Sequence, residues 1–354
     1  MTRFAWLQSR TQTLVVTGLL AALAVAAAVT GVQMSHLFHS SVAHCTTGCG
    51  FAIDRFLRHD SFLDNTFDIL ARAAPALLGM FWGAPLVARE LETGSYRLAW
   101  TQSVSRRRWL LTRLAVAGLA TVALAGLLTL TITWWYTSRD QTGGSVPFAL
   151  FDRRDIVPVA YAAFAFAIGT LLGAVLRRTV PAMAATLGVF VVTRVAISTW
   201  VRPHLMPPVH QTLSLLGAGP DRRVQLGVGF SNGGPLQLFI NGGGPPRSWT
   251  LSSYPVTSSG HRPTSGQLTA FVHQYCPNVG PPPAPPPGGG VARVIGQDSD
   301  RACLAQVAKH FHVLVSYQPD SRYWAFQWME AGIFVALTAA ALVACYFWVI
   351  RRAS

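Results

Sequence analysis

Residues 89–97 read Arg-Glu-Leu-Glu-Thr-Gly-Ser-Tyr-Arg and residues 105–109 read Ser-Arg-Arg-Arg-Trp, in a chain that otherwise avoids charge. Six arginines fall between Arg89 and Arg113, and Glu90 and Glu92 lie among them. Long apolar segments flank this stretch on both sides. Arginine-rich loops between apolar spans are typical of the cytoplasmic side of a membrane protein. The stretch therefore predicts a membrane protein whose loop 89–109 offers both signs of charge to a partner.

The composition supports the membrane class. Of the 354 residues, 51% are hydrophobic and only 12% are charged, whereas about 25% are charged in an ordinary soluble domain. The formal charge is +14. Most basic residues flank apolar spans, which favours membrane topology and contact with anionic lipid head groups over nucleic-acid binding. We expect membrane lipid, and no nucleic acid, among the partners.

The apolar segments predict six transmembrane helices, each long enough to cross the roughly 30 Å hydrocarbon core. A short amphipathic lead, residues 1–11, precedes the first span. A cleaved signal peptide is the competing interpretation, but the apolar core of about 22 residues exceeds the usual 7–15. The second span is the shortest and contains two prolines, Pro75 and Pro85. The predicted spans are Thr13–Met34, Ala73–Ala88, Leu110–Tyr136, Ile156–Leu176, Pro181–Val201 and Trp328–Ile350.

Six spans place both termini on one side of the membrane. The short basic turns cluster on that side, so the positive-inside rule predicts that both termini are cytoplasmic in the plasma membrane. Omitting the weak second span would reverse every later segment and turn the positive loops outward. The charge pattern thus supports the second span.

The segment between the fifth and sixth spans reads as a small folded domain. Short alternating runs in 224–240 and 312–317 predict strands, and 265–275 and 300–311 predict helices. A Pro/Gly-rich loop, 277–290, connects them. We expect an all-α polytopic membrane protein with six transmembrane helices and a small α/β extracellular domain. The predicted divisions are 1–201, 202–325 and 326–354.

Four cysteines, Cys45, Cys49, Cys276 and Cys303, fall on the predicted outer side. They fit two disulfides in an oxidising compartment. We prefer Cys45–Cys49 with Cys276–Cys303 among the three possible pairings. Zinc binding by Cys45 and Cys49 with the nearby His36, His39 and His44 is the alternative, and we expect no metal.

Two ionisable residues within predicted spans are candidates for a transport path. Glu330 lies just inside the sixth span and Arg194 within the fifth, toward its outer end. Ionisable groups at membrane depth are functional candidates, although Glu330 could be solvated near the interface and Arg194 could snorkel.

No enzymatic motif is present. Ser-x-x-Lys, His-Glu-x-x-His and Gly-x-Ser-x-Gly are all missing. The only lysine, Lys309, has no glycine near it, so the chain has no P-loop for ATP. We expect no catalytic residues and no cofactor in this chain.

The loop 89–109 has two interpretations. Three arginines in a row at 106–108 suffice for a solvated turn that only sets topology. The loop also contains further pattern: an acidic pair, then a Thr-Gly break, and then a short segment of helical length. This pattern suits a surface helix that presents Glu90 and Glu92 to a soluble protein.

At Glu90-Leu91-Glu92-Thr93-Gly94-Ser95-Tyr96-Arg97-Leu98, followed by Ser105-Arg106-Arg107-Arg108-Trp109, the sequence resembles permease subunits of ABC-2-type transporters. In that family the first cytoplasmic loop is marked by an acidic residue, then Gly-Ser/Thr, and then Ser-Arg before the third span. The segment between spans five and six resembles that of actinobacterial members at Tyr317-Gln318-Pro319, Arg322-Tyr323-Trp324 and Gln327-Trp328. It is larger than the short outer segment usual in the family.

The resemblance implies the membrane half of an exporter. Two permease chains, a homodimer in the simplest case, would each receive a separate ABC ATPase subunit, so that two ATPase copies hold the ATP and Mg²⁺. The loop would be the coupling helix seated on the ATPase. Its implied coupling residues are Glu90, Glu92, Thr93, Gly94, Ser95, Arg97, Arg106 and Trp109.

Two other classes stay open. One is a membrane-anchored receptor or sensor with a ligand-binding ectodomain, for which one or two spans would suffice. The other is an ATP-independent transporter or channel, which usually has ionisable residues near mid-membrane, and these spans have almost none. The sequence does not name a substrate.

Overall fold

The computed structural model describes residues 2–45, 49–59, 61–93, 106–141, 147–214, 224–230, 236–275, 292–294 and 301–352. The chain divides into two compact units. We call Met1–Leu205 with Tyr323–Ser354 the membrane unit, and Met206–Arg322 the inserted unit. Each is described by itself.

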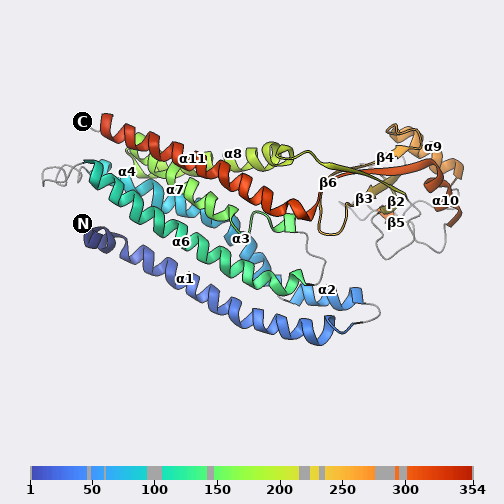
Figure 1. Cartoon of the computed structure of the whole chain (residues 1–354), viewed down its shortest axis with the longest axis horizontal. Coiled ribbons are helices and arrows are strands. Elements are labelled where there is room, and N and C mark those ends of the chain that lie inside the picture. Colours follow the sequence, from blue (N-terminus) through green and yellow to red (C-terminus); the bar gives the residue numbers. More distant parts are fainter. Residues whose placement is uncertain are drawn as a thin grey trace. The chain divides into compact units, whose positions relative to one another are not determined.

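The membrane unit is a helical bundle (Figure 1). Its described residues include six helical segments long and apolar enough to cross a membrane. This confirms the predicted six-span fold. The α-helices of the unit are α1 (Thr2–Leu37), α2 (Cys49–His59), α3 (Ser61–Leu78), α4 (Ala84–Thr93), α6 (Arg106–Asp140), α7 (Val157–Leu176), α8 (Thr179–Ala196) and α11 (Tyr323–Arg352).

Three π-helical segments and two 3₁₀ turns lie at or between these helices. The first π segment follows α1, the second joins α3 to α4 within span two, and the third follows α8 and leads into a 3₁₀ turn. Such departures from regular helix are often found at functional sites. The π segments are Phe38–Val42, Gly79–Gly83 and Ile197–Val201, and the 3₁₀ turns are Pro147–Leu150 and Arg202–His204.

The first two spans differ from their predicted bounds. The predicted amphipathic lead and first span form one helix, α1, which begins at Thr2. Span two covers Ser61–Glu92 instead of starting at Ala73. Charged residues in its first turns had hidden the start of the helix. Two of them are paired, since Asp68 Oδ1 lies 2.7 Å from Arg153 Nε and Asp64 lies 3.1 Å from Arg139.

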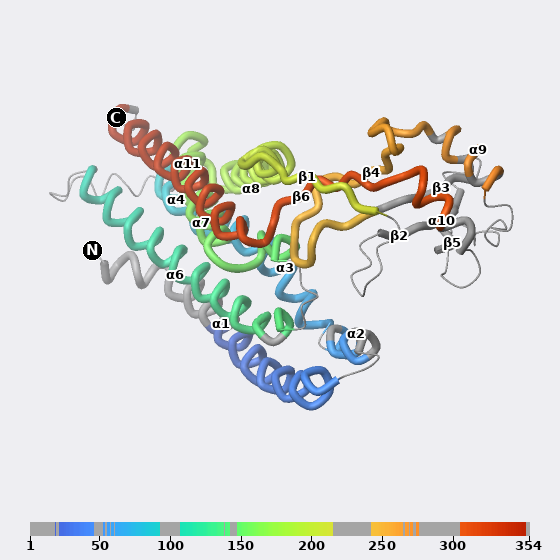
Figure 2. The backbone as a smooth tube through the Cα atoms, turned by 45° about the vertical axis from the view of Figure 1, so that its right-hand side comes forward, coloured from blue at the N-terminus to red at the C-terminus, as the bar shows by residue number. Residues whose placement is uncertain are grey.

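Helix α7 is the central span of the bundle. It packs against α3, α4, α6, α8 and α11, and both tube and ribbon place it beside α11 (Figures 1 and 2). Its sequence is apolar all round, which suits a helix that buries every face. Helix α1, by contrast, contacts chiefly α6.

Glycines bring span two against α7. A Cβ atom added to Gly173 would lie 2.4 Å from the Ala84 carbonyl oxygen, and one added to Gly79 would lie 2.5 Å from the Ala165 carbonyl oxygen. Gly169 and Gly83 meet backbone of the opposite helix in the same way. Small residues four apart allow two helix backbones to approach closely in a membrane. Here they fix the second span to the centre of the bundle.

The two ends of the bundle carry different side chains. Helix α1 begins, and α11 ends, at what we call the basic end (Figure 1). Exposed arginines lie at the end of α4, at the start of α6, in the α7–α8 turn and at the end of α11. The opposite end, which we call the tryptophan end, has exposed tryptophans typical of a membrane interface. The arginines are Arg89, Arg107, Arg108, Arg177, Arg178 and Arg351. The tryptophans are Trp134, Trp200, Trp324 and Trp328.

The inserted unit contains two three-stranded antiparallel sheets, with strand orders β1-β6-β4 and β3-β2-β5. The predicted helices at 265–275 and 300–311 are confirmed, as are the predicted strands in 224–240 and 312–317. Central strand β6 buries Val313 and Val315. The elements are β1 (Val209–Ser214), β2 (Val224–Phe230), β3 (Leu236–Gly242), β4 (Trp249–Thr257), α9 (Ser265–Tyr275), β5 (Ala292–Val294), α10 (Arg301–His310), β6 (Phe311–Gln318) and a 3₁₀ turn (Asp320–Arg322).

Candidate functional site

The last turn of α4 enters the predicted coupling loop, and its first acid is turned inward. Glu90 is 7% exposed and forms an ion pair with Arg113 of α6. The Arg113 guanidinium also lies 5.1 Å from the ring centroid of buried Trp109, within the range of a cation–π contact. A buried carboxylate is costly unless it is paired and hydrogen-bonded. Glu90 therefore joins span two to span three.

The second acid, Glu92, caps a different helix. Its Oε2 atom accepts hydrogen bonds from the Thr179 backbone N–H at 3.0 Å and from the Thr179 hydroxyl at 2.7 Å. The first N–H groups of a helix lack partners within it and attract negative charge. The N-cap residue of α8, Arg178, makes no side-chain cap. Glu92 supplies from α4 the acceptor that α8 lacks.

The other predicted coupling residues fall partly outside the described residues. Gly94, Ser95 and Arg97 lie outside them. Thr93 ends α4 and Arg106 begins α6, so these two frame the loop. Trp109 is buried one turn into α6, in an apolar cluster with Val87 and Leu110. Glu90 and Trp109 thus both contact Arg113, whereas Glu92 contacts Thr179 at the α7–α8 turn.

A buried ionic cluster occupies the tryptophan end. Arg202 donates from Nε to Glu330 Oε2 at 2.6 Å and from Nη2 to Glu330 Oε1 at 2.8 Å. Nη2 also reaches Asp152 Oδ1 at 2.5 Å, and the Tyr161 hydroxyl donates to Glu330 at 2.5 Å. Glu330 is 0% exposed. We call Asp152, Tyr161, Arg202 and Glu330 the arginine cluster.

Asp152, the carboxyl of the arginine cluster that lies outside the spans, has a lowered pKa. Burial alone would raise the pKa of Asp152, but the charge and hydrogen bond of Arg202 outweigh burial and hold that pKa below its ordinary value. The Arg202 guanidinium also lies 4.3 Å from the centroid of the Phe151 ring. The cluster ties α7, the end of span five and α11 to the α6–α7 connection.

Gln327 adds a second cross-helix cap beside the cluster. Its Oε1 accepts from the backbone N–H groups of Ile156 at 3.3 Å and Val157 at 3.0 Å, at the start of α7. Its amide donates to the Phe151 carbonyl and to the Tyr323 hydroxyl, both at 3.1 Å. Helices α7 and α8 are therefore both capped by side chains from other spans.

The candidate path residues have different surroundings. Glu330 is held within the arginine cluster, whereas Arg194 is half-buried, donates to the Arg72 carbonyl at 3.0 Å and lies 4.9 Å from the Tyr161 ring centroid. Sequence reasoning missed Arg202, because it follows the predicted end of span five by one residue. A basic residue next to a span end, with an acid in another span, is the signal that could have found the pair.

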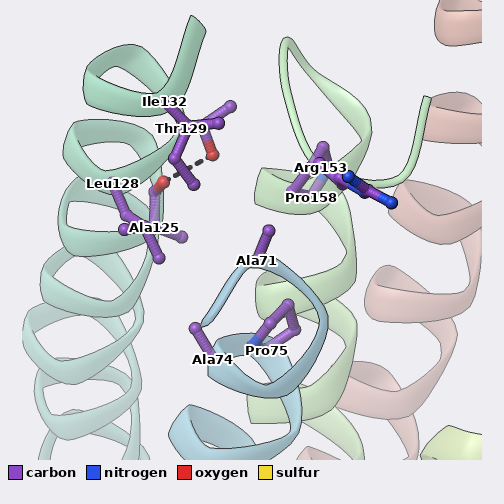
Figure 3. Close-up of a pocket in the computed structure, with 9 residues that line it drawn as sticks. All are labelled: Ala71, Ala74, Pro75, Ala125, Leu128, Thr129, Ile132, Arg153 and Pro158. Atoms are coloured by element: carbon purple, nitrogen blue, oxygen red, sulfur yellow. Dashed lines mark hydrogen bonds between the residues drawn. The ribbon is translucent and has the colours of Figure 1, made fainter. Parts of the chain in front are cut away.

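A narrow apolar pocket lies between α3, α6 and α7 (Figure 3). The Thr129 hydroxyl donates a hydrogen bond to the Ala125 carbonyl of its own helix at 2.7 Å, so its proton does not point into the pocket. Arg153 alone is titratable among the lining residues, and its Nε lies 2.7 Å from Asp68. The pocket holds no constellation for catalysis. Its lining is Ala71, Ala74, Pro75, Ala125, Leu128, Thr129, Ile132, Arg153 and Pro158.

The cysteine and histidine candidates do not assemble into a metal site in the part of the chain that the structure describes, where no group of three or more ligating side chains is found. Cys45 follows the π segment after α1 and Cys49 begins α2. Cys276 lies outside the described residues, and the side chains of Cys49 and Cys303 are not described. The preferred disulfide pairing stays a prediction.

The comparisons with known proteins agree with this architecture. The chain matches the ABC-2 membrane transporter related family over residues 17–202, more than half of its length, a region that spans α1 to the turn after α8. No curated protein and no solved structure matches it. With six spans and this match, the chain is a multi-pass membrane protein that belongs to the ABC-2 membrane transporter related family, as a transport permease of that kind.

Proposed function

We propose that this permease is the membrane half of an ABC exporter, driven by two copies of a separate ATPase subunit that hold ATP and Mg²⁺. The observation that carries the proposal is the family match over spans one to five, together with the acid- and arginine-rich loop between spans two and three. The chain has no P-loop of its own. In this proposal ATP closes the ATPase pair, and the loop 89–109 passes the movement to the spans.

The loop supports coupling because its ends are joined to several spans. Glu90 contacts α6 and Glu92 contacts α8, so a displacement at the loop reaches both helices. ATP can drive the membrane subunit only if its two conformations bind the closed ATPase pair differently. We place that difference at Glu90, Glu92, Thr93, Gly94, Ser95, Arg97, Arg106 and Trp109, either by direct contact with the ATPase or by support of the loop.

The orientation follows from charge. We propose that the basic end faces the cytoplasm with both termini and that the inserted unit is extracellular. The interface of a homodimer, and lipid, would cover the exposed apolar side chains of the spans. Glu330 and Arg194 stay candidates for the path, and either would line it only after its present contacts open.

We also propose the disulfides Cys45–Cys49 and Cys276–Cys303. They are supported by the expected oxidising location and by the even number of cysteines on the predicted outer side. Peptide mapping by mass spectrometry without reduction tests the pairing. Cys45 linked to a cysteine other than Cys49 would refute it.

The function is tested by co-expression with candidate ABC ATPase subunits from the same genome. The expected result is a stable complex in which the permease stimulates ATP hydrolysis and, in vesicles, drives export. Proteins that work without a partner usually have ionisable groups near mid-membrane. Among the described spans, Arg194 is bonded to the Arg72 carbonyl and Glu330 is paired with Arg202, so that alternative has no specific support.

A further inference from the structure

Glu90 and Glu92 lie on opposite faces of the last turn of α4. Residues two apart on an α-helix are separated by about 200° around its axis, because each turn holds 3.6 residues. One acid can therefore hold α6 on one side while the other holds α8 on the other side. The contacts with Arg113 and Thr179 follow this geometry.

The two contacts differ in their exposure to solvent. Glu90 is buried with Arg113 against Trp109, and breaking a buried pair leaves an uncompensated charge. Glu92 is exposed, and water competes for its carboxylate. The Glu90 contact is therefore the lasting joint, and the Glu92 contact is the one that a modest displacement can open.

Helix α8 is suited to move when the Glu92 contact opens. Its buried residues, Ala182, Thr186 and Phe190, form one stripe at spacing four, and most of its other side chains are at least partly exposed. At the junction with α4 the buried side chains are small, with Ala84 and Ala88 against Ala182, and the flexible Met183 packs beside them. Such a surface can slide with little interdigitation to break.

We propose that Glu92 is a positioning residue that links the coupling loop to span five through Thr179, and that this link opens and re-forms during the transport cycle. The inference rests on the proposed function. It gives Glu92 a partner inside the chain, in place of direct contact with the ATPase. Loss of the link leaves the ATPase bound but disconnects its movement from span five.

The first test uses the full chain co-expressed with the ABC ATPase that the wild-type chain binds. E92Q and T179V should co-purify the ATPase at the wild-type level, while stimulation of ATP hydrolysis falls several-fold. T179S keeps the hydroxyl and should match wild type. T112V is the matched control, since it removes a hydroxyl near the same end that bonds only the Arg108 carbonyl of its own helix.

The double variant E92Q/T179V should lose less stimulation than the sum of the two single losses, because the hydroxyl bond that T179V removes is part of the contact that E92Q weakens. Additive losses, or wild-type stimulation by E92Q, would overturn the link. Reduced co-purification by E92Q would overturn it too, since Glu92 would then contact the ATPase itself.

The second test works on the purified chain without the ATPase. In E92C/T179C, mild oxidation should form a cross-link between α4 and α8, detected in a linked peptide. In the complex this cross-link should abolish the stimulation that remains in reduced E92C/T179C, and reduction should restore that remaining level, with oxidised and reduced wild type as controls. Absence of the cross-link would refute the contact. Unchanged stimulation after cross-linking would refute its movement.

These outcomes separate the link from the proposed function. If the wild-type chain binds and stimulates no ATPase, the proposed function fails and the inference falls with it, even where the cross-link forms. If wild type stimulates and E92Q does the same, only the role of Glu92 fails.

Discussion

Arg202 at the end of span five and Glu330 in span six form a two-point ion pair, with nitrogen-to-oxygen distances of 2.6 and 2.8 Å. Both side chains are almost fully buried. Asp152 and Tyr161 complete the hydrogen bonding around them. The pair thus ties the fifth and sixth spans at the tryptophan end, while Glu92 ties the second and fifth at the basic end.

Breaking the buried pair on one side should be strongly destabilising. We expect Arg202→Met to lower the free energy of unfolding by about 3–5 kcal/mol, because the buried Glu330 carboxylate would lose its Arg202 partner. The double variant R202M/E330L should lose less. Thermal unfolding in detergent measures both.

The control for this experiment is the exposed pair of Arg247 and Asp320, whose nitrogen-to-oxygen distance is 3.1 Å. Arg247→Met should change stability by no more than about 1 kcal/mol. An equal loss in R202M and R247M would contradict a special role for the buried pair.

Glycine contacts between span two and α7 should tolerate no side chain. We expect Gly173→Ala to reduce the yield of folded protein and its unfolding temperature, since the new Cβ would lie 2.4 Å from the Ala84 carbonyl oxygen. Gly188→Ala is the matched control, because its Cβ meets nothing within 4 Å. It should be neutral, or more stable by up to about 1 kcal/mol from helix propensity. Similar behaviour of the two variants would argue against close packing here.

Acid should weaken the arginine cluster through Asp152. Its pKa is held below the ordinary value of 3.8 in the folded protein. The unfolded chain therefore binds the proton more readily, so the stability that Asp152 contributes is full above 3.8 and is lost as the pH falls toward the folded pKa. Asp152→Asn should be less stable than wild type at neutral pH, and the difference should shrink in acid. Unfolding scans of both proteins from about pH 3 to about pH 7 measure this difference in stability. A difference that stays constant with pH would contradict the lowered pKa of Asp152.

The proposed orientation can be mapped with single introduced thiols in a background without reactive native cysteines. Arg107→Cys at the basic end should react with a membrane-impermeant reagent only after the cells are opened. Ser259→Cys, at an exposed turn of the inserted unit, should react on intact cells. Labelling of R107C on intact cells would invert the orientation and end the coupling proposal.

Hydropathy predicted the spans because a bilayer selects for composition over some twenty residues. It failed at helix ends, where charges are paired within the fold. Asp64 and Asp68 hid about three turns of α3, because Asp64 pairs with Arg139, and Asp68 pairs with Arg153 as well as with nearby Arg72. The same reason explains why Arg202, Asp152 and Tyr161 were not predicted as a cluster.

The helix contacts of the bundle had a signal in the sequence that hydropathy does not read. Gly79 and Gly83 in span two, and Gly169 and Gly173 in span four, are each four apart, the spacing that lets helices approach closely. Their pairing across two helices could not be deduced from one chain, because other glycines in the spans have open space around them. Gly188 is one such residue.

In the inserted unit the prediction found the strands with strong alternation and missed β1, β4 and β5. Strand β4 contains Pro255 and two serines, and a register shift interrupts it between Thr250 and Ser252. Proline is tolerated there because β4 is an edge strand. Edge position depends on the whole sheet, so a local window does not show it.

The length of α7 sets the membrane that suits this permease. Its 20 residues rise about 30 Å, which equals the hydrocarbon thickness of an ordinary bilayer. At its first residue the Gln327 side chain caps α7, and at its other end Arg177 adopts a left-handed backbone conformation that ends the helix. Helix α7 therefore cannot be extended to match thicker lipid. Because the longer outer spans can tilt but the enclosed α7 cannot, lipids with long acyl chains would have to thin locally around the protein. Acyl-chain length is thus a variable that reconstitution of this protein should control.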